Sequence, residues 1–126
     1  MKKQEFISQV QAAAGLTDRV EAERWAKAVI GALAELAPDS ETQRQLVTQL
    51  PGFLKSHVQA SARRSLVMDR EALIQHVGAA LDLHAPDARR ALLAVWAVIR
   101  RSVSEGELAD YEARVPKDVA ALLEAG

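Results

Sequence analysis

Three histidines, His57, His76 and His84, are the side chains best suited to bind a metal ion or to move a proton. A metal site on helices needs ligands three or four residues apart, so that several side chains reach within about 2 Å of the ion. His76 and His84 are eight residues apart, and only Asp82 and Asp87 lie near His84 along the chain. We therefore expect surface or helix-capping histidines, with no metal and no cofactor.

Carboxylates two residues apart are the next candidates for acid–base chemistry. Side chains at this spacing point to different sides of a helix, so a pair cannot share a proton or hold one ion. The serines lack the glycine-flanked turn of a catalytic nucleophile, and the chain has no cysteine. We therefore expect no enzymatic activity. The carboxylate pairs are Glu21/Glu23, Glu105/Glu107 and Asp110/Glu112.

The middle of the chain is basic, and its most prominent feature is the doublet Arg63-Arg64, flanked by Lys55 and Arg70. Guanidinium groups bind carboxylates and phosphates in two-pronged contacts. However, no aromatic side chain lies in the basic segment 55–70 to stack on bases, and the whole chain has a net charge of −1. Solvated or internally paired arginines are favoured over a partner-protein contact, and both are favoured over nucleic-acid binding.

An apolar stretch, Leu66-Val67-Met68, follows this doublet. Spare apolar side chains of this kind can cover a partner protein, including a second copy of the chain. We therefore predict Arg63, Arg64 and Met68 as partner-contact residues. A role for Met68 in closing the core is the alternative.

The elements that position these residues are expected to be helices, because alanine is the commonest residue and aromatic side chains are few. The apolar spacing predicts a helix over 3–14 that ends at Gly15, and a long helix that starts at Thr17 or Asp18 and ends before Pro38. Ser40 with Gln43 forms a capping-box pattern for a third helix, and a fourth follows Pro51.

The second half of the chain follows the same plan. Asp69 is the expected cap of its first helix, Pro86 opens a long helix, Ser104 opens a short one, and Pro116 precedes the last. A direct comparison supports this reading, because residues 6–16 match residues 73–83 with five of eleven positions identical.

We therefore predict an all-α fold for residues 1–126, a single compact helical domain of about eight helices. It consists of two tandem four-helix repeats, units 1–58 and 69–126, with a pseudo-two-fold relation. A short basic linker, residues 59–68, joins the units as either a loop or a helical extension.

One helix is expected at the centre of a core shared by both units. Residues 91–99 form an uninterrupted apolar run that includes Trp96, and a helix that is apolar all round is usually covered on all sides. Gly31 and Gly78 interrupt predicted helices, which close packing of another helix explains best. The run of nine residues is too short to cross a bilayer, and no apolar stretch of signal-peptide length follows the first residues, so we expect a cytoplasmic protein.

The pattern of the two long helices and of the turns that follow them resembles a bacterial family catalogued as domain of unknown function 2267. The resemblance covers nearly the whole chain. It implies an all-α duplicated fold, and it implies no activity and no site residues. It rests on residues 21–24, 28–30, 33 and 49–51, with a second copy around residues 94–95 and 114–116.

These observations favour a non-enzymatic helical module that acts through protein contacts, with self-association as one form. The alternative is a protein that binds a small ligand in the cleft between the repeats, near Trp25 and Trp96, or an anionic partner such as nucleic acid on the basic segment 55–70.

Overall fold

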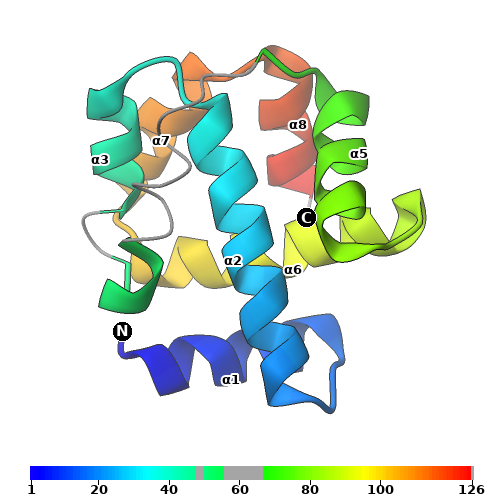
Figure 1. Ribbon diagram of the computed structural model, residues 1–126. Coiled ribbons are helices and arrows are strands. Elements are labelled where there is room, and N and C mark those ends of the chain that lie inside the picture. The colour runs from blue at the N-terminus through cyan, green and yellow to red at the C-terminus, as the bar shows by residue number, and fades with distance from the viewer. Residues whose placement is uncertain (48–49, 56–66, 126) are drawn as a thin grey trace.

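The protein is described by a computed structural model, in which residues 1–47, 50–55 and 67–125 can be described. Every element in these ranges is a helix, as the composition predicts, and residues 52–55 are helical as well (Figure 1). The longer helices are α1 (Lys3–Ala14), α2 (Arg19–Leu36), α3 (Ser40–Val47), α5 (Arg70–Leu81), α6 (Ala85–Ser102), α7 (Glu105–Arg114) and α8 (Lys117–Ala125).

The turn between α1 and α2 follows the local signals of the sequence. Gly15 has a φ of 68°, and the Leu16 N–H donates to the Gln11 carbonyl at 2.9 Å, so α1 ends in a left-handed turn. Asp18 caps α2, because its carboxylate accepts a hydrogen bond from the Val20 N–H at 2.9 Å. Both helix boundaries are confirmed.

The end of α5 has the same geometry, although an aspartate takes the left-handed position. Asp82 has a φ of 55°, and the Leu83 N–H donates to the Gly78 carbonyl at 2.9 Å. A Cβ on Gly78 would lie 2.7 Å from the Leu83 carbonyl oxygen and 3.4 Å from the Cβ of Ala88. The close approach predicted at Gly78 is therefore present, between the end of α5 and the start of α6.

The predicted cap of α3 is wrong by one residue. Ser40 is already inside the helix, and Asp39 accepts hydrogen bonds from both the N–H and the hydroxyl of Thr42, at 2.8 and 2.7 Å. These bonds, the N–H first, lower the pKa of Asp39. A carboxylate also suits the positive end of the helix dipole better than a hydroxyl does. At α5 the expected cap is correct, because Asp69 accepts a hydrogen bond from Ala72 N–H at 2.8 Å.

Helix α6 lies at the centre of the molecule, as its apolar sequence predicts. It packs against α1, α2 and α5, and Figure 1 shows it crossing behind α2. Trp96 is 1% exposed, and its ring centroid lies 6.0 Å from that of Tyr111 in α7. One core cluster takes side chains from every helix named above.

The two halves of the chain pack on each other through crossed pairs of helices. Helix α1 contacts α2 and also α6, while α5 contacts α6 and also α2. Helices α3 and α7 form another pair between the halves, and they lie across α2 from α5 and α8 (Figure 1). As a result α2 and α5, from different halves of the sequence, lie side by side.

Two side chains from neighbouring helices bind the last carbonyl groups of α2. The Tyr111 hydroxyl donates to the Leu33 carbonyl at 2.6 Å, and the Gln43 amide donates to the Ala34 carbonyl at 2.9 Å. The Ala37 N–H also donates to Ala34, at 3.2 Å, in place of Leu33. Because the last carbonyls of a helix lack donors in the helix itself, these contacts secure the end of α2 in the core. Burial raises the pKa of Tyr111, so its hydroxyl remains a donor.

Candidate functional site

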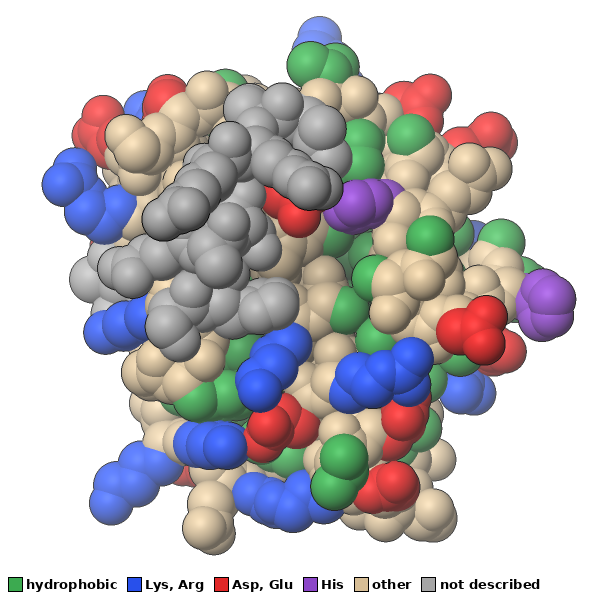
Figure 2. All heavy atoms as spheres, in the orientation of Figure 1, with side chains coloured by type: hydrophobic (Ala, Val, Ile, Leu, Met, Phe, Trp, Pro, Cys, Tyr) green, Lys and Arg blue, Asp and Glu red, His purple; other side chains and the backbone are tan. Residues whose placement is uncertain are grey.

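A groove of about 550 Å³ runs between α2 and α5. Its lining combines small or apolar side chains with charged ones, and Val20, at 76% exposed, also borders it. Figure 2 views this face, where apolar side chains lie in the hollow and side chains of both charges border it. The apolar lining residues are Ala28, Gly31, Ala32, Ala80 and Leu81, and the charged or titratable ones are Glu23, Arg24, Lys27, Glu35 and His76.

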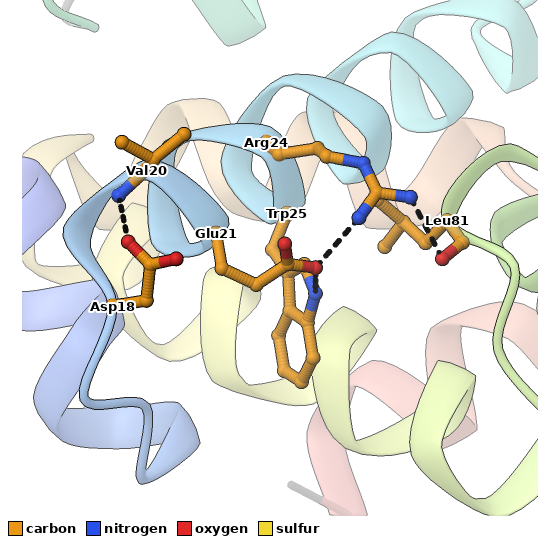
Figure 3. A network of polar contacts seen from close by, with 6 residues as sticks. All are labelled: Asp18, Val20, Glu21, Arg24, Trp25 and Leu81. Carbon is orange, nitrogen blue, oxygen red and sulfur yellow. Dashed lines mark hydrogen bonds and ion pairs between the residues drawn. The ribbon is translucent and has the colours of Figure 1, made fainter.

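Arg24 connects the two walls of the groove near the start of α2. Its Nη2 donates to the carbonyl of Leu81, the last residue of α5, at 2.9 Å, and its Nη1 contacts Oε1 of Glu21 at 2.7 Å. The same oxygen accepts a hydrogen bond from Trp25 Nε1 at 2.9 Å (Figure 3). A cation is favoured at the negative end of a helix dipole, so Arg24 stabilises the contact between α2 and α5.

A second polar contact joins the two helices farther along the groove. Nε2 of His76, on α5, lies 2.9 Å from Oε2 of Glu35, on α2. Glu35 is the more buried partner, with a side chain 12% exposed against 35% for His76. The contact is an ion pair when the imidazole is protonated, and a hydrogen bond when the neutral ring carries its proton on Nε2.

The other carboxylate of the lining is neutralised from both sides. Glu23 lies 3.1 Å from Lys27 and 3.1 Å from Lys3 of α1. Hydrogen bonds from Lys27 and then Lys3 lower the pKa of Glu23. Both lining carboxylates therefore already contact cations or an imidazole of the same protein. The groove offers apolar surface with a neutralised border, which suits the binding of an apolar group better than proton transfer.

Of the predicted partner-contact residues, Met68 lies in the described part of the chain. Arg63 and Arg64 fall outside the described residues, as do residues 59–66 of the predicted linker. Met68 is 6% exposed and belongs to the core cluster, whereas Val67 beside it is 99% exposed.

Of the three candidate histidine ligands, His76 and His84 lie in the described part of the chain. His84 occupies the exposed N-cap position of α6, and His57 lies outside the described residues. Within the described ranges, no three histidine or acidic side chains gather closely enough to hold a metal ion. Trp25 and Trp96 are both buried in the core, and neither lines the groove.

A cleft between the two units was expected from the sequence, but near Trp25 and Trp96, and the residues that line the α2–α5 groove were not predicted. One signal for them exists. Ala28, Gly31, Ala32 and Glu35 lie three to four residues apart and so share one side of α2. Small side chains on a helix face are more often part of its packed side, so this pattern alone does not indicate an open surface. His76 can be connected with Glu35 only through the packing of α5 on α2.

The sequence is similar to a known family of proteins. No helix in the described part of the chain has a stretch long and apolar enough to span a membrane. No curated protein matches the sequence. Residues 3–122 match the family described as "Uncharacterized conserved protein (DUF2267)". That match covers nearly the whole sequence, and the chain therefore belongs to the DUF2267 family.

Proposed function

We propose that this chain is a non-enzymatic, cytoplasmic binding module that acts through protein contacts, and that the groove between α2 and α5 receives an apolar segment of its partner. The observation that carries the proposal is the composition of the groove. Its apolar lining is alanine, glycine and leucine, and its carboxylates are already paired within the protein.

The partner segment that fits this groove has apolar side chains on one side. Small lining residues leave room for larger side chains of the partner, whose burial stabilises a complex by about 25 cal/mol per Å² of apolar surface. The exposed Val20 extends the apolar surface beyond one end. The charged residues of the lining already pair within the protein, so the apolar side chains of the partner provide the binding energy.

Two neighbouring alanines provide a matched test. Ala79 and Ala80 are both exposed on α5, but only Ala80 lines the groove. A photo-crosslinking residue placed at position 80 should capture a partner in the native host, and the same residue at position 79 should not. The captured protein is then purified and its affinity measured directly.

We expect Ala80→Arg to weaken that affinity by more than about ten-fold and Ala79→Arg to leave it unchanged, since ten-fold corresponds to about 1.4 kcal/mol. Equal effects of the two substitutions, or none from either, would refute the proposal that the partner binds in the α2–α5 groove. If the captured protein is a second copy of the chain, light scattering should show a dimer that Ala80→Arg dissociates.

A small ligand in the same groove is the second candidate, because a volume of about 550 Å³ lies within the usual range for such sites, roughly 300–1,000 Å³. If a small ligand binds there, adding the right metabolite should raise the melting temperature of the protein, and the crosslinking residue at position 80 should capture no protein. The nucleic-acid alternative predicts DNA binding at about 50 mM salt that Arg63→Ala/Arg64→Ala abolishes.

We also infer that units 1–58 and 69–126 arose by duplication. Helices α1 and α5 are both 12 residues long, and α2 and α6 are both 18. The left-handed residues Gly15 and Asp82 stand 67 positions apart, the same offset as the matched sequences. The crossed packing of α1 on α6 and of α5 on α2 also fits a two-fold relation. In a crystal structure, α5 and α6 should superimpose on α1 and α2; a different crossing angle would argue against this.

A further inference from the structure

A second groove, of about 320 Å³, lies among α5, α6 and α8, and two of its lining residues are arginines. Arg70 is the first residue of α5, and Arg89 is the fifth residue of α6. In the described part of the chain, neither guanidinium makes a hydrogen bond or an ion pair. Two like charges therefore line one hollow, and neither forms an ion pair in the described part of the chain.

In the first half of the chain, the two corresponding positions hold a cation and a carboxylate. Lys3 is the first residue of α1, and Glu23 is the fifth residue of α2, so they hold the same helix positions as Arg70 and Arg89. Nζ of Lys3 and Oε1 of Glu23 form an ion pair at 3.1 Å. At the corresponding place in the second half, the carboxylate is replaced by a second cation.

The neighbouring acidic groups do not take over the role of that carboxylate. Asp118 is close, but its Oδ2 accepts a hydrogen bond from the Arg70 N–H and its Oδ1 accepts one from the Val119 N–H, both at 2.9 Å. Glu71 also lines the groove, and one carboxylate leaves an excess of positive charge beside two arginines. The Gln75 side-chain amide adds a further donor.

The remaining lining is apolar. Ile74 is half-buried, Leu122 is 2% exposed, and Ala85 completes the wall. The volume is at the lower end for small-molecule sites, about 300 Å³. Guanidinium groups bind a carboxylate in a planar, two-pronged contact, and the apolar wall can cover a short hydrocarbon attached to it.

We infer that the groove between α5, α6 and α8 binds a small-molecule carboxylate with an apolar body, such as a medium-chain fatty acid, through Arg70 and Arg89. The ligand carboxylate takes the place that Glu23 occupies in the first half, and its hydrocarbon lies against Ile74 and Ala85. This site is separate from the α2–α5 groove, so it does not depend on the function proposed there.

Octanoate is the probe, and its binding to the full chain is measured by calorimetry and by the rise in melting temperature at low salt. We expect wild type to bind octanoate, and Arg89→Glu to bind it more than about ten-fold less tightly. Arg89→Glu should also melt no lower than wild type without ligand, because a carboxylate at position 89 can pair with Arg70 as Glu23 pairs with Lys3. This second readout separates loss of the site from loss of the fold.

Lys2→Glu is the matched control, because it makes the same change of net charge at an exposed position on the other half of the chain. It should bind octanoate as wild type does. No binding by wild type, or equal binding by wild type and Arg89→Glu, overturns the inference. Binding of inorganic phosphate as tight as that of octanoate would show that the groove recognises charge alone. This result would overturn the inference that the groove also binds the hydrocarbon of the ligand.

Discussion

The hydroxyl of Tyr111 is a single atom whose removal tests how the end of α2 is held in the core. The hydroxyl is completely buried, and its hydrogen bond to the Leu33 carbonyl is short, at 2.6 Å. The Ala37 N–H, which would ordinarily bond Leu33, is directed to Ala34. Tyr111→Phe therefore leaves a buried carbonyl without this donor, which costs about 1–3 kcal/mol.

The size of the effect can be converted to a change in melting temperature. For a chain of 126 residues the entropy of unfolding is about 0.26 kcal/mol/K, so each kcal/mol lowers the melting temperature by about 4 °C. Tyr111→Phe should then melt about 4–11 °C below wild type, as measured by circular dichroism at neutral pH. Tyr111→Leu should melt lower still, because it also removes the ring that packs on Trp96.

The pH dependence of the wild-type protein provides an independent check. Because burial raises the pKa of Tyr111 in the folded state, the fold favours the neutral phenol. The stability from this group is present below the pKa of an unfolded tyrosine, about 10, and declines as the pH rises above it. Tyr111 is the only tyrosine, so the absorbance of tyrosinate should appear only with unfolding. A melting temperature of Tyr111→Phe within about 1 °C of wild type would refute this account of the hydrogen bond.

Further substitutions test the core, the turns and one partly buried acid. Trp96→Ala should lower the free energy of unfolding by about 3–5 kcal/mol in urea titrations, and a melting temperature equal to wild type would contradict the central position of α6. Gly15→Ala should lower the free energy of unfolding by about 1–2 kcal/mol, because Gly15 has a φ of 68° and the added methyl group would meet no neighbour within 4 Å. Asp82→Gly should raise the free energy of unfolding by up to about 1 kcal/mol, because Asp82 also has a positive φ. Opposite signs in thermal melts would show that φ does not dominate the stability at these two turns. Burial and then the nearby Glu124 raise the pKa of Glu112, so its carboxylate destabilises the fold increasingly as the pH rises above about 4. Glu112→Gln should therefore raise the melting temperature at neutral pH, and this gain should shrink towards about pH 4; a gain that is independent of pH would exclude the charge as its cause.

Most of the helical plan could be predicted from the sequence, because local signals determine it. Gly15, Asp18 and Asp69 end or begin helices through contacts within a few residues, and each acts as its residue type predicts. The predicted cap of α3 is wrong because two residues that favour this position, Asp39 and Ser40, are adjacent. Only the hydrogen bonds of Thr42 show which of them is used.

The residues that line the grooves could not be predicted, because they depend on contacts between distant parts of the chain. Glu35 and His76 are 41 residues apart, and Arg24 and Leu81 are 57 apart. A pattern within one helix does not show which other helix will pack against it. The internal repeat indicated that the halves are alike, but it did not indicate that α1 would pack on α6 and α5 on α2.

This crossed packing has a consequence for how the protein is made. Helix α1 leaves the ribosome long before α6 is synthesised, so part of its apolar side has to wait for a helix that begins at Ala85. Contacts between such distant segments slow folding, and they link the two ends of the chain in one cooperative transition. A nascent chain stalled before Ala85 should therefore remain sensitive to proteases even in the helices that have already emerged.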